Sequence, residues 1–388
     1  MPNATPIYLD HNATTPILPE VVDAMLPYLR EHFGNPSSSH PYGAAARRAV
    51  ALAREDVARL LAAEPDEIVF TSGGTEANNL AIFGAMEGAS RRGLVTSVVE
   101  HPATSRPAAR LEAYGAKVTR LGVDDAGRVH MGEARGAIDV ATRLVSIMHA
   151  NNETGMLQPI AELSTHARAH GALVHTDAAQ SVGKVVVDVG ELGVDMLTVA
   201  GHKLYAPKGV GALYVRRGVA LAPFALGAGH ERGLRPGTEN VASIVGLGTA
   251  CAIARRELAS EAARVRALRD RLHQRLAARV FGLALNGGVE GRLPNTLSVR
   301  FPGVRGSVVL AGAPEIAAST GSACHEGGEE ASAVVLAMGI APEDALGTVR
   351  LSLGRGTTED DVDRAAHALA SAWERAGGAT TVTGPTGL

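Results

Sequence analysis

The stretch DMLTVAGHKLYAPKGVGALYV, residues 195–215, carries a lysine directly after an apolar run. The run predicts a buried strand, and the tripeptide Gly-His-Lys follows where that strand ends. An amine at the edge of a sheet is partly desolvated, which lowers its pKa toward the neutral, nucleophilic form. The chain has only four lysines, and we expect Lys117, Lys184 and Lys208 to be solvated in turns or at exposed strand ends. Lys203 is therefore the candidate for lysine chemistry.

On both sides of this stretch, apolar runs alternate with segments of helical periodicity. Strands are predicted at 67–71, 94–99, 117–121, 143–149, 172–175, 196–199 and 211–215. Helices are predicted at 44–62, 75–87, 106–114 and 160–170. Strands that alternate with helices form mainly parallel sheets. This part of the chain is therefore expected to be an α/β domain.

Beyond about residue 241 the pattern changes to a long helical stretch that runs to about residue 280. Two short strands and a last helix are predicted after it, at 296–301, 308–310 and 360–376. The change of pattern indicates a domain boundary near Arg256. The Gly- and Thr-rich residues 377–388 have no apolar period and predict a frayed tail.

The composition is that of a globular protein. Of 388 residues, 46% are hydrophobic and 20% are charged, which excludes a disordered chain, a collagen and a charged coiled coil. The formal net charge of −3 points to no polyanionic partner, so no binding to nucleic acid is expected. Two cysteines cannot cross-link a chain of this size, which suits a reducing compartment. Because neither a signal peptide nor an apolar run of ~18 residues is found, we expect a cytoplasmic protein that does not bind membranes.

A second motif, FTSGGTEANN at 70–79, takes a predicted strand into a Ser-Gly-Gly-Thr turn that opens a helix. The backbone amides of Gly73, Gly74 and Thr75 at the positive end of this helix would suit a phosphate. The turn matches neither of the nucleotide-binding patterns G-x-x-x-x-G-K-[ST] and G-x-G-x-x-G. Taken alone, it fits a capping turn, with Ser72 or Thr75 as the cap, as well as it fits an anion site.

An acidic residue, Asp177, stands at the carboxyl end of the predicted strand in LVHTDAAQSVGK, residues 173–184. Ligands of doubly wound sheets bind at this end, although by itself the carboxylate is better explained as a cap of the next helix. Together, the phosphate turn, Asp177 and Lys203 specify a cofactor with a phosphate, a basic ring nitrogen and an aldehyde. That cofactor is pyridoxal 5'-phosphate.

The two cysteines lie in different surroundings. Cys324 is in a Gly/Ser/Glu-rich segment, IAASTGSACHEGGEEASAVV at 316–335, which predicts a loop. An exposed thiol on a loop suits a nucleophile or an acid, with His325 beside it to assist ionisation; the alternative is a chance surface cysteine. Cys251, within an apolar helical run, is expected to pack in the core.

Most of the 14 histidines are expected on the surface or in turns. His101 ends a predicted strand before Pro102, where it could stack on a ligand ring or cap the next turn, and a nearby cofactor favours the first role. The sequence contains no H-E-x-x-H, C-x-x-C or carboxylate cluster, so no metal site is expected.

These residues lie within a series of motifs that resembles the cysteine desulfurases and selenocysteine lyases, a class V aminotransferase-like group of pyridoxal-phosphate enzymes of fold type I. The matching motifs, in chain order, are YLDHNATTP (8–16), GNPSSSH (34–40), FTSGGTEANN (70–79), EHPA (100–103), NNETG (151–155), HTDAAQSVGK (175–184), GHKLYAPKGVGALY (201–214), GHERGLRPGTEN (229–240), GSAC (321–324) and RLSLGRGTT (350–358). They cover nearly the whole chain, which makes the resemblance highly specific.

The resemblance implies an aspartate-aminotransferase-like α/β fold of two domains. A large cofactor-binding domain at 12–255 would hold a mainly parallel seven-stranded sheet. A smaller α+β domain, made of 1–11 and 256–376, would carry the loop with Cys324, and 377–388 would be a flexible tail.

The resemblance also implies a role for each matching residue. Around pyridoxal phosphate, Lys203 would form the Schiff base, Asp177 would pair with the ring nitrogen, and His101 would stack on the ring as a catalytic residue. Gln180 would contact the ring hydroxyl. The phosphate would be held by Gly74, Thr75 and His202 and, from the partner subunit of a homodimer, by Thr238.

For the substrate, the resemblance implies that Asn152 and Arg350 bind the carboxylate, the arginine by a two-pronged hydrogen bond. Cys324 would accept the sulfur. Some positions depart from the pattern. Ala200 stands where many desulfurases have a phosphate-binding serine, and Ala206 and the GAGHE segment (227–231) replace glycines or Gln often seen in the family. Ala200, and His325 after the loop cysteine, look closer to selenocysteine lyases.

The chain is therefore predicted to be a cysteine desulfurase that converts L-cysteine to L-alanine, leaves the sulfur on Cys324 as a persulfide, and passes it to an acceptor protein. The alternatives are a lyase acting on L-selenocysteine and a pathway-specific C–S lyase or transaminase, which would not need Cys324. A non-catalytic scaffold for sulfur carriers is disfavoured, because Lys203, Asp177, Arg350 and Cys324 are all present.

Overall fold

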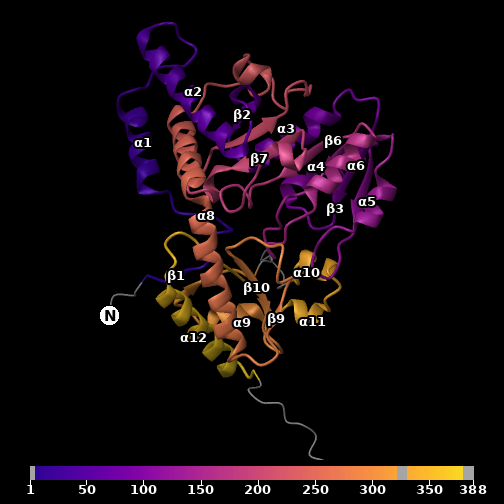
Figure 1. Ribbon diagram of the computed structural model, residues 1–388, viewed down its shortest axis with the longest axis vertical. Coiled ribbons are helices and arrows are strands. Elements are labelled where there is room, and N and C mark those ends of the chain that lie inside the picture. The colour runs from indigo at the N-terminus through magenta and orange to yellow at the C-terminus, as the bar shows by residue number, and fades with distance from the viewer. Residues whose placement is uncertain (1–4, 321–329, 379–388) are drawn as a thin grey trace, which may run out of the picture.

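The computed structural model describes residues 5–320 and 330–378 and shows two sheet-containing parts joined by one long helix (Figure 1). The predictions for Cys324 and His325, and for most of the tail, lie outside the described residues.

The larger part is built on a seven-stranded sheet with the order β2-β8-β7-β6-β5-β3-β4. Its strands are β2 (Ile68–Thr71), β3 (Gly93–Ser97), β4 (Lys117–Leu121), β5 (Thr142–Ser146), β6 (Leu173–Asp177), β7 (Met196–Ala200) and β8 (Gly211–Val215). Only β8 is antiparallel to its neighbours, β2 and β7, and the other pairs are parallel. The prediction of an α/β fold with a mainly parallel sheet is confirmed.

Both faces of this sheet are covered by helices, as buried parallel strands require. Alternate residues of a strand point to opposite faces, so Phe70 and Val95 join one core cluster while Val69 and Leu94 join another. The second cluster includes residues of α3 (Gly74–Met86) and α4 (Pro102–Ala113). The first includes residues of several other helices, among them α2 (Pro41–Leu61), α5 (Met131–Ala137), α6 (Ile160–Ala169) and α8 (Val241–Ala277).

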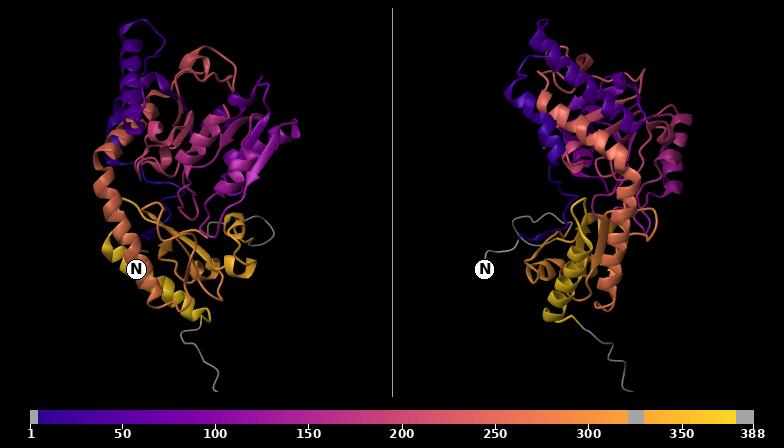
Figure 2. Two further views of the ribbon diagram at one scale, coloured as in Figure 1. Left: turned by 45° about the vertical axis from the view of Figure 1, so that its right-hand side comes forward. Right: turned by 60° about the vertical axis from the view of Figure 1, so that its left-hand side comes forward.

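Helix α8 has 37 residues and runs from the larger part into the smaller one (Figures 1 and 2). It packs against α1 (Pro19–Arg30) and α2 in the larger part, and against α12 (Glu359–Arg375) in the smaller part. Along α8, the buried residues pass from the first core to that of the smaller part between Ile253 and Val265. The expected boundary near Arg256 therefore falls inside a continuous helix, with no linker to mark it.

The smaller part holds a three-stranded antiparallel sheet and one pair of parallel strands. The sheet has the order β12-β10-β9, and β1 pairs with β11. These strands are β1 (Ile7–Tyr8), β9 (Ala284–Leu285), β10 (Thr296–Arg300), β11 (Ile316–Ala317) and β12 (Thr348–Ser352). The short helices of the molecule are α7 (Val189–Leu192), α9 (Gly306–Ala311), α10 (Ala333–Ala337) and α11 (Pro342–Ala345).

The strand predicted at 308–310 is wrong, because these residues form part of helix α9. Three consecutive apolar residues have no period that separates a strand from a buried helix. In the helix, Val309 is fully buried whereas the neighbouring Val308 is 47% exposed. Gly306 lets the helix start against β12, since a Cβ there would lie 2.1 Å from the carbonyl oxygen of Thr348.

Candidate active site

A cavity of about 230 Å³ lies at the carboxyl ends of the parallel strands. Residues from the loops after β2, β3, β5, β6 and β7 line it, because these ends meet at one edge of the sheet. Eight of the residues predicted for a site are among them: Gly74, Thr75, His101, Asn152, Asp177, Gln180, His202 and Lys203.

Lys203 ends the short 3-10 turn η2 (Gly201–Lys203), which follows β7 directly. The turn packs closely on the next strand, since a Cβ on Gly201 would lie 2.8 Å from the carbonyl oxygen of Val210. Burial lowers the pKa of Lys203 below the usual lysine value; Asp177 opposes this shift and Arg350 adds to it. The nucleophilic neutral amine is therefore more accessible at neutral pH than on a surface lysine.

Asp177 ends β6 and is 8% exposed. Its Oδ2 accepts a hydrogen bond from Asn78 Nδ2 at 2.7 Å, and its Oδ1 accepts one from the Ala179 amide at 3.0 Å. The carboxylate thus caps the following turn and also lines the cavity. The two roles suggested by the sequence, a helix cap and a ligand-binding residue, are therefore compatible. Sequence reasoning missed Asn78, because a buried asparagine on a helix gives no sign of which strand it will face.

The start of α3 has no side-chain N-cap, although Glu76 Oε2 accepts the Ser72 amide of the preceding turn at 2.8 Å. Its N-cap is Gly73, with φ at +151° and no side-chain cap, so the alternative of a capping turn with Ser72 or Thr75 as the cap is wrong. Gly73 lies tight against β8, since a Cβ on Gly211 would be 2.7 Å from the Gly73 Cα. The first amides of an α-helix have no partner within the helix. The cavity residues Gly74 and Thr75 lie at this uncapped, positive helix end, which favours an anion.

His101 is the N-cap of α4 and lines the cavity as well. Its Nδ1 accepts a hydrogen bond from the Ala103 amide at 3.1 Å, so the proton of the neutral ring is on Nε2. Burial lowers the pKa of His101; Asp177 opposes this shift and Lys203 adds to it. The ring is therefore neutral at physiological pH and free to stack on a ligand.

His202 and Ala200 form the wall near the uncapped helix. Burial, with nearby positive lysines, lowers the pKa of His202 to about 4, and its Nδ1 lies 3.2 Å from Thr14 Oγ1. A neutral imidazole can still donate one hydrogen bond to a phosphate. A Cβ on Gly74 would lie 3.3 Å from the Ala200 Cβ, so this part of the wall is apolar.

Arg350 reaches the cavity region from β12 of the smaller part. It is 7% exposed, its Nη2 donates to Asp10 Oδ1 at 2.7 Å, and its Nη1 donates to the Asn152 carbonyl oxygen at 3.1 Å. Its buried Nε has no hydrogen-bond partner among the described residues. An unpaired buried guanidinium N–H is a costly arrangement that a substrate carboxylate would relieve.

The expectation that Lys184 is a solvated surface residue is wrong. Its Nζ donates to Gln180 Oε1 at 2.9 Å and to Asn12 Oδ1 at 3.2 Å, next to the cavity. Burial, together with the positive charges of Lys203 and Arg350, lowers the pKa of Lys184 to about 7. The sequence around Lys184 does not predict this burial, because the residue that packs over the amine, Asn12, comes from the distant N-terminal segment.

Thr238, unlike the other predicted site residues that the structure describes, is not brought to the cavity region. Thr238 is exposed on the segment that leads into α8, away from the lining of its own chain. Cys324 lies outside the described residues. Ser319, before that undescribed segment, donates its amide to the Arg350 carbonyl oxygen at 3.4 Å, and Ser332, after it, donates its hydroxyl to Glu153 Oε2. Both flanks thus adjoin Arg350 or the NNETG motif.

Other expectations concern the rest of the molecule. Cys251 is fully buried, as expected, and burial raises the pKa of its thiol. The described residues contain no group of three or more His, Cys, Asp or Glu side chains that could hold a metal ion. Within the same residues, none of the helices is both long enough and apolar enough to cross a bilayer.

Comparison with known proteins gives consistent matches over nearly the whole chain. The family model described as Aminotransferase class-V matches residues 7–365. A protein described as a cysteine desulfurase from Gluconacetobacter diazotrophicus is 48% identical over 363 residues, which cover 92% of this chain and 91% of that protein. A solved structure described as a NifS-like protein is 38% identical with a TM-score of 0.88, and the match covers 96% of this chain and 99% of that one. A structure described as SspA in complex with cysteine is 36% identical with a TM-score of 0.80, covering 89% and 98%.

Proposed function

The chain belongs to the aminotransferase class V family and is a cysteine desulfurase within it, and we propose that the cavity around Lys203 is its active site. The reaction converts L-cysteine to L-alanine and leaves the sulfur on Cys324 as a persulfide. One observation carries this proposal: a single cavity gathers a buried lysine, a held carboxylate and an uncapped helix start, with Arg350 beside it. The sequence match at GSAC supports the role of Cys324.

The cavity residues fit pyridoxal 5'-phosphate. The uncapped start of α3, with Gly74, Thr75 and the neutral His202, suits the phosphate, and Asp177 suits a protonated ring nitrogen. When bound, the cofactor supplies an aldehyde on which amines exchange and a ring that takes up the electrons of a substrate carbanion. Gln180 also lines the cavity, which supports its expected contact with the ring hydroxyl.

Lys203 acts first as the anchor of the cofactor and then as a base. As a free amine, Lys203 would use its lowered pKa to remove the proton from the substrate Cα and to return a proton later. Asp177, fixed by Asn78 and the Ala179 amide, keeps a proton on the ring nitrogen. The neutral His101 stacks on the ring without adding a positive charge that would compete with this proton.

Arg350 and Asn152 hold the substrate carboxylate and so orient the sulfur. The Cys324 thiolate attacks that sulfur, forming an S–S bond while the substrate Cβ–S bond breaks. The electron pair of the broken bond stays on the substrate carbon, which takes up a proton and leaves as alanine. One cysteine thus yields one alanine and one persulfide, with no external oxidant or reductant.

We infer that the enzyme is a homodimer in which Thr238 reaches the phosphate of the partner subunit, and that an acceptor protein removes the persulfide sulfur. The exposure of Thr238 outside its own cavity supports this arrangement. Ala200, which lacks the hydroxyl of the serine found in many desulfurases, keeps L-selenocysteine as a second candidate substrate.

The test is alanine formation from L-cysteine and from L-selenocysteine, with and without a reductant, together with mass spectrometry of the Cys324 peptide. One added sulfur on that peptide after L-cysteine, and loss of cysteine turnover in Cys324→Ala, are expected. Full cysteine turnover in Cys324→Ala would remove the nucleophile role. Borohydride reduction followed by peptide mapping should place the cofactor label on Lys203, and a label elsewhere would overturn the assignment of the site.

A further inference from the structure

Lys184 is a buried amine that the reaction above does not use. It is not among the lining residues of the cavity, but it stands directly behind one of them, Gln180. Its Nζ has two acceptors, Gln180 Oε1 at 2.9 Å and Asn12 Oδ1 at 3.2 Å, and both are amide oxygens. A lysine buried beside other cations has an unfavourable electrostatic environment, so its position calls for a functional explanation.

The contact with Lys184 helps to fix the orientation of the Gln180 side-chain amide. Lys184 donates to this amide, so the amide oxygen is the end that faces Lys184. The NH₂ end of Gln180 then points the other way, where Nε2 donates to the backbone oxygen of Asn12 at 3.0 Å. The Asn12 carbonyl oxygen can only accept, so this bond and the bond to Lys184 require the same orientation of the amide and fix it together.

Asn12 extends this constraint to the rest of the site. It is 1% exposed, and its Nδ2 donates to Thr296 Oγ1 at 2.9 Å and to the Asn152 carbonyl oxygen at 3.2 Å. Its Oδ1 also accepts from Asn295 Nδ2 at 3.1 Å. A single chain of hydrogen bonds therefore runs from Lys184 through Asn12 to Thr296 of strand β10 and to Asn152 of the NNETG motif.

We propose that Lys184 is a positioning residue that, together with the Asn12 carbonyl, holds the Gln180 amide so that its NH₂ group, and not its oxygen, is the end available to bound pyridoxal phosphate. This inference rests on the proposed function. An N–H presented to a ring oxygen stabilises the deprotonated oxygen. The proton shared between that oxygen and the nitrogen of Lys203 is then lost at a lower pH than it would be without the fixed amide.

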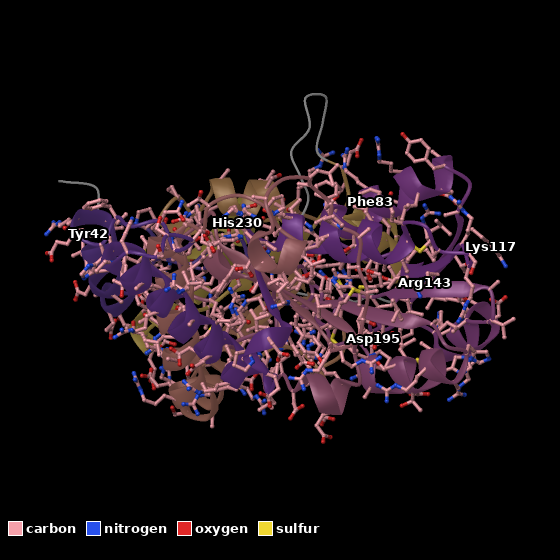
Figure 3. The ribbon with its side chains drawn as sticks, turned by 90° about the horizontal axis from the view of Figure 1, so that it is seen from above. Tyr42, Phe83, Lys117, Arg143, Asp195 and His230 are labelled. Carbon is pink, nitrogen blue, oxygen red and sulfur yellow. The ribbon has the colours of Figure 1, made fainter. Side chains whose placement is uncertain are left out.

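The test is a pH titration of the absorbance of the bound cofactor, in the holoenzyme and without substrate. Lys184→Met is expected to raise the titration midpoint by about 1 pH unit, which corresponds to about 1.4 kcal/mol. Lys184→Arg, which keeps a donor, should stay near the wild-type midpoint. Lys117→Met is the matched control, because Lys117 lies at the outer edge of the molecule (Figure 3) and should leave the midpoint unchanged.

A double-mutant cycle separates positioning from the simple loss of a charge. Gln180→Ala should raise the midpoint, and adding Lys184→Met to it should cause no further change, because the amide is already absent. If the two shifts add, or if Lys184→Met alone leaves the midpoint unchanged, the positioning role is overturned. Should Lys184→Met not fold, an unshifted midpoint in Gln180→Ala overturns the role in the same way. Wild-type protein that takes up no pyridoxal phosphate would instead overturn the proposed function.

Discussion

Replacing Glu231 by alanine is expected to destabilise the protein much more than replacing a carboxylate on its surface. The Glu231 side chain is 3% exposed and binds both terminal nitrogens of Arg54, at 2.6 and 2.7 Å. It also accepts the backbone amide of Phe70 at 2.8 Å. Its φ of +46° is in the left-handed region, which a residue other than glycine keeps only where its surroundings hold it there.

The magnitude follows from what the substitution leaves behind. Removing one partner of a buried ion pair costs about 3–5 kcal/mol, because the other charge stays buried without compensation. The Arg54 side chain is 18% exposed, so water reaches it in part, and we expect the lower end of this range, ~3 kcal/mol. The lost acceptor of the Phe70 amide works in the same direction.

Urea unfolding of the holoenzyme, followed by circular dichroism, measures the effect. Asp66→Ala is the matched control, since its ion pair with Arg217 at 2.8 Å is largely solvated and such pairs add little to stability. A loss in Glu231→Ala no larger than that of the control would refute the reasoning. Because Glu231 anchors the segment that carries Thr238, the same variant should also bind pyridoxal phosphate more weakly.

Three further predictions concern the cavity. Ala200→Ser adds a hydroxyl next to Gly74 and should lower the Kd of pyridoxal phosphate about tenfold. The reason is that a hydrogen bond to a charged group contributes ~1.5–3 kcal/mol. An unchanged Kd in equilibrium dialysis would show that the hydroxyl does not reach the phosphate. Arg350→Lys loses the planar guanidinium group and should raise the KM for L-cysteine at least about tenfold, or ~1.4 kcal/mol, with a smaller change in kcat. A fall in kcat at constant KM would contradict the role of Arg350 in binding the substrate carboxylate. Burial raises the pKa of Glu100 from 4.5 to about 8, so its contribution to stability is greatest below pH 4.5 and is lost as the pH rises to about 8. Glu100→Gln should flatten the stability curve over this window, and an unchanged slope in urea unfolding would count against a protonated Glu100.

The strands of the large sheet could be predicted because each is a short apolar run followed by a turn signal. For β8 the predicted 211–215 agrees at both ends, and for β7 the end differs by one residue. Helix α4 begins at Pro102, earlier than predicted, because proline at the first helical position is a start signal that the apolar period did not include. Helix α1 was missed, as was the pairing of β1 with β11, which joins residues far apart in the sequence.

The site could be predicted where a residue sits at the end of a strand, because the sheet edge then brings such residues together. Lys203 and Asp177 follow from this rule. Lys184 was misjudged, since its exposure depends on Asn12, a residue 172 positions away that covers it. Asp10, which binds Arg350, was missed for the same reason. Local patterns give the position of a strand end, but not which distant segment packs over it.

The geometry of the reaction depends on contacts that cross between the two parts of the molecule. Lys203 is carried by the large sheet, whereas Arg350 is carried by β12 of the small one. The substrate Cα lies within reach of the Lys203 amine only if Arg350 and Lys203 are held at a fixed distance from each other. A misplacement of about 1 Å can lower the reaction rate considerably. The hydrogen bonds from Arg350 to the Asn152 carbonyl and from Asn12 to Thr296 span this junction. Substitution of Asn12, which does not line the cavity, should therefore lower kcat as strongly as substitution of a lining residue.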